Sequence, residues 1–127
     1  MERSNLSARN VVEMVLHAAQ TKDKNLFRRV FIKDQELFAL FPWGNAVNGY
    51  DEFMHSQHDF FASPSIHFEG KIVRSVESAS LSQFGAEVQL ITQEGEKKRI
   101  YINYLLKYDE GLWKIVSIQN TFLPELK

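Results

Sequence analysis

The sequence predicts a single α+β domain whose N-terminal helices pack on one face of an antiparallel sheet. Up to Pro64, apolar residues recur at helical spacing, and from Ile66 onward they alternate with polar residues as in a strand. Short glycine-containing turns separate the last three strand-like segments, which favours hairpins and therefore antiparallel pairing. Helices that precede a run of strands indicate the α+β class.

The length and composition are those of one soluble folded domain. The chain has 127 residues, of which 44% are hydrophobic and 24% charged, and this suffices to bury a core without disulfides or metals. We find no internal repeat and no linker, so residues 1–127 are predicted to form one domain. Ten phenylalanines, four tyrosines and two tryptophans can fill a core and line a pocket.

Charge and cysteine content exclude several classes of function. A net charge of −1 leaves no basic surplus for a nucleic acid partner, and no stretch is apolar enough to cross a membrane. The absence of cysteine removes disulfides, thiolate nucleophiles and zinc–sulfur sites, and it fits a cytoplasmic location. Because the sequence also lacks a phosphate-binding loop, we expect no cofactor.

Two helices are predicted at the N-terminus. The first has Ser7 as its N-cap and ends near Thr21, and Asp23 caps the second. The apolar stripe of the first helix consists of Val12, Val15, Leu16 and Ala19, and that of the second consists of Leu26, Phe27, Val30 and Phe31. Both stripes follow the spacing of one helix face, so the two helices should pack on the same core.

A short strand and a third helix follow. The apolar run 37–41 reads as a strand and ends at the turn signal Pro42-Trp43-Gly44-Asn45. Asn48-Gly49 opens the third helix, which has two carboxylates in its first turn, where the helix dipole favours them. Pro64 ends this helix because the residue before a proline avoids the helical region.

Four longer strands complete the predicted sheet. The first begins at Ile66, and the others span residues 83–93, 98–108 and 112–122. The third of them carries apolar groups on both faces, with Tyr101 and Leu105 opposite the row that contains Tyr104. Apolar groups on both faces of an antiparallel strand indicate that both faces are covered. We therefore expect a homodimer through the sheet face.

Four stretches in this order resemble the SnoaL-like, or nuclear transport factor two-like, superfamily with its cystatin-like fold. They are residues 12–23, the run 34–49 with its Leu-Phe-Ala-Leu-Phe-Pro and Asn-Gly, residues 101–111, and a final strand beginning Trp-Lys-Ile-Val-Ser-Ile. The resemblance implies a curved antiparallel sheet that forms a cone-shaped half-barrel with one pocket. It implies no single activity, because members include ketosteroid isomerases, polyketide cyclases, dehydratases, small-molecule binders and association domains.

The resemblance argues against ketosteroid isomerase chemistry in this chain. The alignment places Val15 where that family has a tyrosine, Ala39 or Leu40 where it has an aspartate base, and Tyr104 where it has an oxyanion-stabilising acid. A hydrogen-bond donor without a base does not abstract a proton. The catalytic residues of a ketosteroid isomerase are therefore not matched.

The same alignment predicts a polar cluster inside the apolar cone. Its members, as candidate ligand contacts, are Ser56, Gln57, Glu87, Gln89, Tyr104 and Asn120. A few polar groups in an apolar cleft are typical of a small-ligand site. The prediction depends on the strand register, because a slip of one residue would send Glu87 and Gln89 to the outer face.

Two residues are candidate bases. Glu87 would be buried in the cone and could act as general acid or base, and His58 lies close to the predicted pocket face of the third helix. His55 and His58 share a helix face, but they match no familiar metal-ligand spacing, so we expect no metal.

Three functions stay open at this point. The chain is most simply a binder of a small apolar ligand. Alternatively, it is an isomerase, cyclase or dehydratase with Glu87 or His58 as base and Tyr104 as hydrogen-bond donor, or a dimerisation module whose core is filled.

Overall fold

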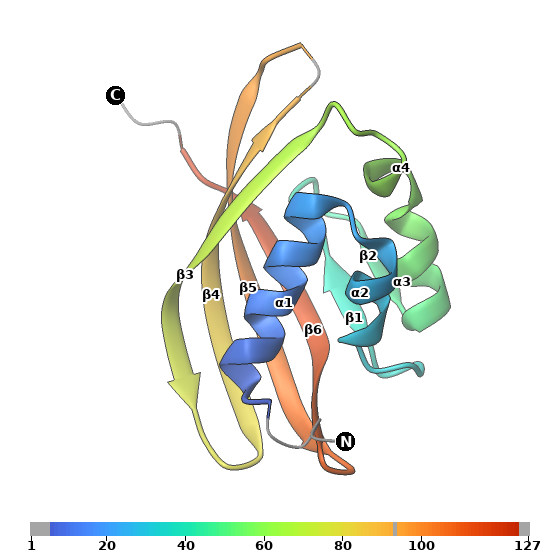
Figure 1. Ribbon diagram of the computed structural model, residues 1–127, viewed down its shortest axis with the longest axis vertical. Helices are drawn as coiled ribbons and strands as arrows, with labels where there is room; N and C mark the ends of the chain where they lie inside the picture. Colours follow the sequence, from blue (N-terminus) through green and yellow to red (C-terminus); the bar gives the residue numbers. More distant parts are fainter. Residues whose placement is uncertain (1–5, 93, 125–127) are drawn as a thin grey trace.

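A computed structural model describes residues 6–92 and 94–124 of the chain. The helices are α1 (Ala8–Thr21), α2 (Lys24–Arg29), α3 (Tyr50–Ser56) and α4 (His58–Phe61). The strands are β1 (Phe38–Leu40), β2 (Ala46–Asn48), β3 (His67–Glu77), β4 (Leu81–Ile91), β5 (Lys97–Asp109) and β6 (Leu112–Phe122). In Figure 1, α1 crosses one face of a curved sheet, and α2, α3 and α4 gather beside it over the β1 end. The predicted α+β class is confirmed.

The sheet has six strands in the order β2-β1-β6-β5-β4-β3. β3 to β6 form an antiparallel meander, as predicted, but β1 pairs with β6 in parallel, so the sheet is mixed rather than antiparallel throughout. A parallel pair needs a long crossover between its strands, and the chain between β1 and β6 supplies one. β2 was not predicted, because a strand of three residues is too short to show an alternation of apolar and polar side chains.

Local signals set the ends of the first two helices. The Ser7 hydroxyl accepts the Asn10 backbone N–H at 3.0 Å, and the Asn10 side chain accepts the Ser7 N–H at 3.1 Å, which closes a capping box. Lys22 ends α1 in the left-handed region at φ 59°, and the Asp23 carboxylate accepts the Leu26 N–H that opens α2. The predicted caps and helix ends are confirmed.

The predicted third helix is divided into two. Gly49 precedes α3 with φ +93°, a conformation that favours glycine, and a Cβ there would lie 2.7 Å from the Gln35 side chain. α3 then ends at Ser56, and the short α4 follows after Gln57. After this break α4 lies beyond the end of α3, and the chain leads from it to β3 (Figure 1).

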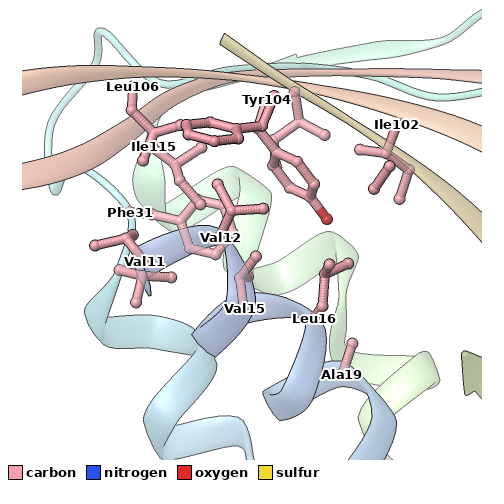
Figure 2. Packing of buried hydrophobic residues seen from close by; sticks show 14 of the residues in the cluster. Val11, Val12, Val15, Leu16, Ala19, Phe31, Ile102, Tyr104, Leu106 and Ile115 are labelled. Atoms are coloured by element: carbon pink, nitrogen blue, oxygen red, sulfur yellow. The ribbon is translucent and has the colours of Figure 1, made fainter. Parts of the chain in front are cut away.

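The core lies between α1 and the inner face of the sheet. Val12 and Val15 of α1 meet Tyr104 and Leu106 of β5 there (Figure 2). The largest side chains with under 2% exposure are Phe31, Phe84, Leu37, Leu106, Ile115, Val12 and Val15. Phe31 lies just after α2, where backbone hydrogen bonds between its two neighbours and Ile115 join this segment to β6.

The outer face of the sheet is mixed in character. Tyr101 points outward from β5 and covers Gly85 of β4, since a Cβ built at Gly85 would overlap the Tyr101 hydroxyl oxygen. A contact within the chain thus accounts for part of the outward apolar area. Val76 and Leu81 are 56% and 52% exposed near the β3–β4 turn. The homodimer through this face stays a prediction.

No helix in the described part of the chain has the length and hydropathy needed to cross a membrane.

Candidate functional site

A pocket of about 450 Å³ opens between the sheet and the helices. Its walls are mainly apolar. The sheet contributes Phe68, Leu90, Ile100, Ile102 and Ile118; the helices and the segment after α2 contribute Val15, Ala19, Phe27, Phe31, Phe53 and Phe60. The volume falls in the range of small-molecule sites, and the cone is therefore not filled by its own side chains.

Tyr104 places a hydroxyl in this apolar wall. The residue is 4% exposed and lies on the inner row of β5. Figure 2 shows its ring directed from the sheet toward α1, with the hydroxyl near Leu16. The oxygen is open to the pocket rather than sealed in the core, and among residues 6–92 and 94–124 it has no hydrogen-bond partner. Tyr104 therefore offers a free donor to whatever enters.

Burial raises the pKa of Tyr104 well above its ordinary value of 10.0, because the apolar surroundings disfavour the phenolate. The phenol is thus neutral throughout the physiological range. It can donate a hydrogen bond, but it does not serve as a base.

Three other predicted contacts also line the pocket, namely Ser56, Gln57 and Asn120. The Asn120 Nδ2 donates to the Leu40 carbonyl at 2.8 Å, which ties β6 to the β1 edge. The Ser56 hydroxyl donates to the Phe53 carbonyl at 2.6 Å, and the Gln57 Nε2 donates to the Ser56 Oγ at 3.3 Å. These side chains are anchored within the fold, whereas the Tyr104 hydroxyl is not.

The predicted placement of Glu87 and Gln89 in the pocket is wrong. The inner row of β4 consists of Phe84, Ala86, Val88 and Leu90, and the intervening residues point to the outer face. Glu87 is exposed there, with Lys71 and Tyr101 as its register partners on the neighbouring strands. The register is one residue away from that predicted, which reverses every side chain of a strand.

His58 also lies outside the pocket. It is exposed on α4 and lines a separate, smaller hollow between α2 and α3. Both candidate bases, Glu87 and His58, are thus removed from Tyr104.

Sequence reasoning missed Asp59, which directly follows His58 and does line the pocket. A helical face is hard to assign when a helix breaks two residues earlier, and no signal in the sequence marks that break. Trp43, Asn45 and Ser63 also line the pocket from loops. Trp43 is 68% exposed and stacks on Phe41 at a centroid distance of 5.8 Å.

Lys22 fastens the loop that forms one side of the pocket. Its ammonium donates to the Ser63 carbonyl at 2.7 Å and to the Ile66 carbonyl at 2.5 Å, and it lies 4.6 Å from the ring centroid of Phe60. Burial lowers the pKa of Lys22. The Lys22 ammonium thus links the end of α1 to the segment between α4 and β3 through hydrogen bonds to two backbone carbonyls.

The Tyr104 hydroxyl should make stability fall at alkaline pH. Above pH 10 the unfolded phenol ionises while the buried one keeps its proton, so the folded state binds more protons and the free energy of unfolding decreases as pH rises. The slope from this group is at most about 1.4 kcal/mol per pH unit. Denaturant unfolding of wild type and Tyr104→Phe between pH 9 and about 11 should show this component only in the wild type.

Tyr108→Phe is the matched control, because Tyr108 is 45% exposed. It should keep the alkaline slope of the wild type. An unchanged slope in Tyr104→Phe would contradict the burial of this hydroxyl.

Comparison with known structures identifies the fold. A ketosteroid isomerase-like protein from Erwinia carotovora atroseptica matches 98% of this chain and 100% of its own, with a TM-score of 0.79 and 14% identity. An NTF2-like protein of unknown function from Shewanella oneidensis matches 89% and 94%, with a TM-score of 0.76 and 12% identity. A cystatin-like domain of unknown function from Nostoc punctiforme matches 93% and 76%, with a TM-score of 0.74 and 16% identity.

This chain has the NTF2-like, cystatin-like fold. The resemblance stated from the sequence is confirmed at the level of the fold. No protein-family model matches the NTF2-like chain, and no curated protein matches it.

The NTF2-like fold also locates the residues that argued against isomerase chemistry. Val15 lines the pocket and Ala39 is fully buried in β1. Neither side chain can transfer a proton, so of the three isomerase positions only Tyr104 carries a polar group.

Proposed function

We propose that this NTF2-like domain binds a small, largely apolar molecule that carries one hydrogen-bond acceptor. The observation that supports this most directly is the Tyr104 hydroxyl, which is open to an apolar pocket of about 450 Å³ and unpartnered among the described residues. Aliphatic and aromatic walls would hold the body of the ligand, and the hydroxyl would fix its orientation by donating to a carbonyl or ether oxygen.

The energetics favour a ligand at this position. The Tyr104 hydroxyl is open to the pocket and so does not carry the penalty of a sealed, unpaired group; a hydrogen bond to a ligand acceptor would contribute about 0.5–1.5 kcal/mol. Burial of apolar ligand surface adds about 25 cal/mol per Å².

Binding is better supported than catalysis. Glu87 and His58, the bases considered from the sequence, lie outside the pocket. Among the described lining residues, the ionisable groups are Asp59 and Tyr104, and Tyr104 stays neutral. The pocket volume also speaks against a module whose core is filled.

A matched pair of probes tests the proposal. We use 2-decanone, which has one acceptor, and decane, which has none, and we follow tryptophan fluorescence because Trp43 lines the pocket. Tyr104→Phe should lower the affinity for 2-decanone by about three- to tenfold, the effect of one neutral hydrogen bond. It should leave the affinity for decane unchanged.

Tyr108→Phe makes the same substitution outside the pocket and should change neither affinity. The proposal fails if neither probe binds the wild type, or if both probes lose affinity equally in Tyr104→Phe. If 2-decanone binds as expected, native mass spectrometry of the purified protein would identify the natural ligand.

A further inference from the structure

A second hollow, of about 210 Å³, lies between α2 and the α3–α4 segment. Its rim is basic, with Lys24 and Arg28 from α2 and His55 and His58 from the facing segment. Lys24 and Arg28 are four residues apart, so they project from the same side of α2. The floor is apolar, formed by Phe27, Met54 and Phe61.

The basic groups of this groove have no partners of opposite charge. The ion pairs found among residues 6–92 and 94–124 join Lys98 to Glu96 and Lys107 to Glu36, far from the groove in the sequence. No acidic residue lines the hollow. Because the chain has a net charge of −1, this cluster is not the result of a general basic surplus.

The acids that neighbour the groove in the sequence do not line it. The Asp23 carboxylate accepts the Leu26 N–H at the start of α2, and Asp59 lines the apolar pocket rather than the groove. The groove therefore presents several donors and no carboxylate among its lining residues. An ammonium and a guanidinium with neighbouring imidazoles match the acceptor-rich geometry of a phosphate or carboxylate.

We propose that the groove between α2 and α3–α4 binds an anionic group, a phosphate or a carboxylate, through Lys24, Arg28, His55 and His58. Binding of a free anion here does not depend on the apolar ligand proposed above, whereas the second source named below rests on that proposed function. The two sites nevertheless adjoin, since Phe27 and Gln57 line both of them. The anion therefore has two possible sources, which share one chemistry: a free small anion, or the charged group of the molecule that occupies the pocket.

The first arm of the test uses inorganic phosphate alone, titrated at constant ionic strength and followed by amide NMR. The wild type should show saturable shifts at residues 24–28 and 54–58. The double variant Lys24→Gln with Arg28→Gln should bind phosphate at least about tenfold more weakly, because two charge-assisted interactions are lost. Added salt should weaken binding in the wild type.

A matched control removes the same two charges elsewhere. Arg74→Gln with Lys97→Gln changes one arginine and one lysine that are exposed on the sheet and outside the groove. It should bind phosphate as the wild type does. Absence of saturable shifts in the wild type, or an equal loss in both double variants, would overturn the proposal.

The second arm identifies the source of the anion by comparing decyl phosphate with 2-decanone. Tighter binding of decyl phosphate that disappears in the groove variant assigns the groove to the charged group of the pocket ligand. If decyl phosphate and 2-decanone bind equally well, and inorganic phosphate still gives saturable shifts, the groove is assigned to a free anion. Failure of both 2-decanone and decane to bind would refute the proposed function alone, because the phosphate titration does not depend on the pocket.

Discussion

Replacement of Phe31 by alanine is expected to lower the free energy of unfolding by about 3–5 kcal/mol, the usual cost of removing a fully buried ring. Phe31 is 0% exposed, and its ring lies 4.8 Å from that of Phe27 and 5.0 Å from that of Phe53, centroid to centroid. It also lines the pocket, so the space it leaves would join a hollow that already exists. Urea unfolding of the two proteins measures the difference.

Phe122→Ala is the control for this large effect. Phe122 is 41% exposed and its ring lies 6.3 Å from that of Trp43, so its removal should cost less than about 1 kcal/mol. Similar losses for the two variants would show that Phe31 does not occupy the centre of the core.

Replacement of Ala19 by phenylalanine is expected to abolish binding of 2-decanone while the domain still folds. Ala19 lies on α1, is 5% exposed and lines the pocket. A benzyl group there would project into the space that the ligand needs, rather than into packed side chains. We expect a stability change of no more than about 1–3 kcal/mol, the range for overpacking. Fluorescence titration and urea unfolding measure the two effects separately.

Gln20→Phe provides the matched control, because it adds the same ring to the same helix at an exposed position outside the pocket. This variant should bind 2-decanone as the wild type does. If Ala19→Phe retains full affinity, the probe binds elsewhere and the pocket is not the ligand site.

The parts of the fold that were predictable are those with local causes. Ser7 and Asp23 cap helices through hydrogen bonds that reach only three residues ahead, so their effect can be read from neighbouring letters. The last strand has the predicted bounds, Leu112–Phe122, because a glycine turn and a proline flank it. The parallel pairing of β1 with β6 has no local cause, since it depends on where a long connection returns the chain.

The error at Glu87 has a different origin. Alternation fixes which residues share a face, but not which face is inner, and the family alignment assigned the wrong one. The residues themselves held the answer, since the apolar set Phe84, Ala86 and Val88 alternates with polar Gln83, Glu87 and Gln89. Four of the six predicted contacts still line the pocket, because β5, β6 and the end of α3 face it as predicted.

Asp59 could not have been found in this way. Its position depends on the break after Ser56, and the sequence around it gives the same helical pattern with or without that break. The groove between α2 and α3–α4 was equally hidden, because its basic residues come from two segments that only the tertiary packing brings together.

The segment between α4 and β3 both binds the Lys22 ammonium and lines the pocket, and it uses different groups for the two roles. The ammonium is held by the main-chain oxygens of Ser63 and Ile66, whereas the side chains of these two residues belong to the pocket wall. Every amino acid provides the same main-chain oxygen. Substitutions at positions 63 and 66 can therefore change which ligands the pocket binds while the hydrogen bonds from Lys22 to the main chain are kept.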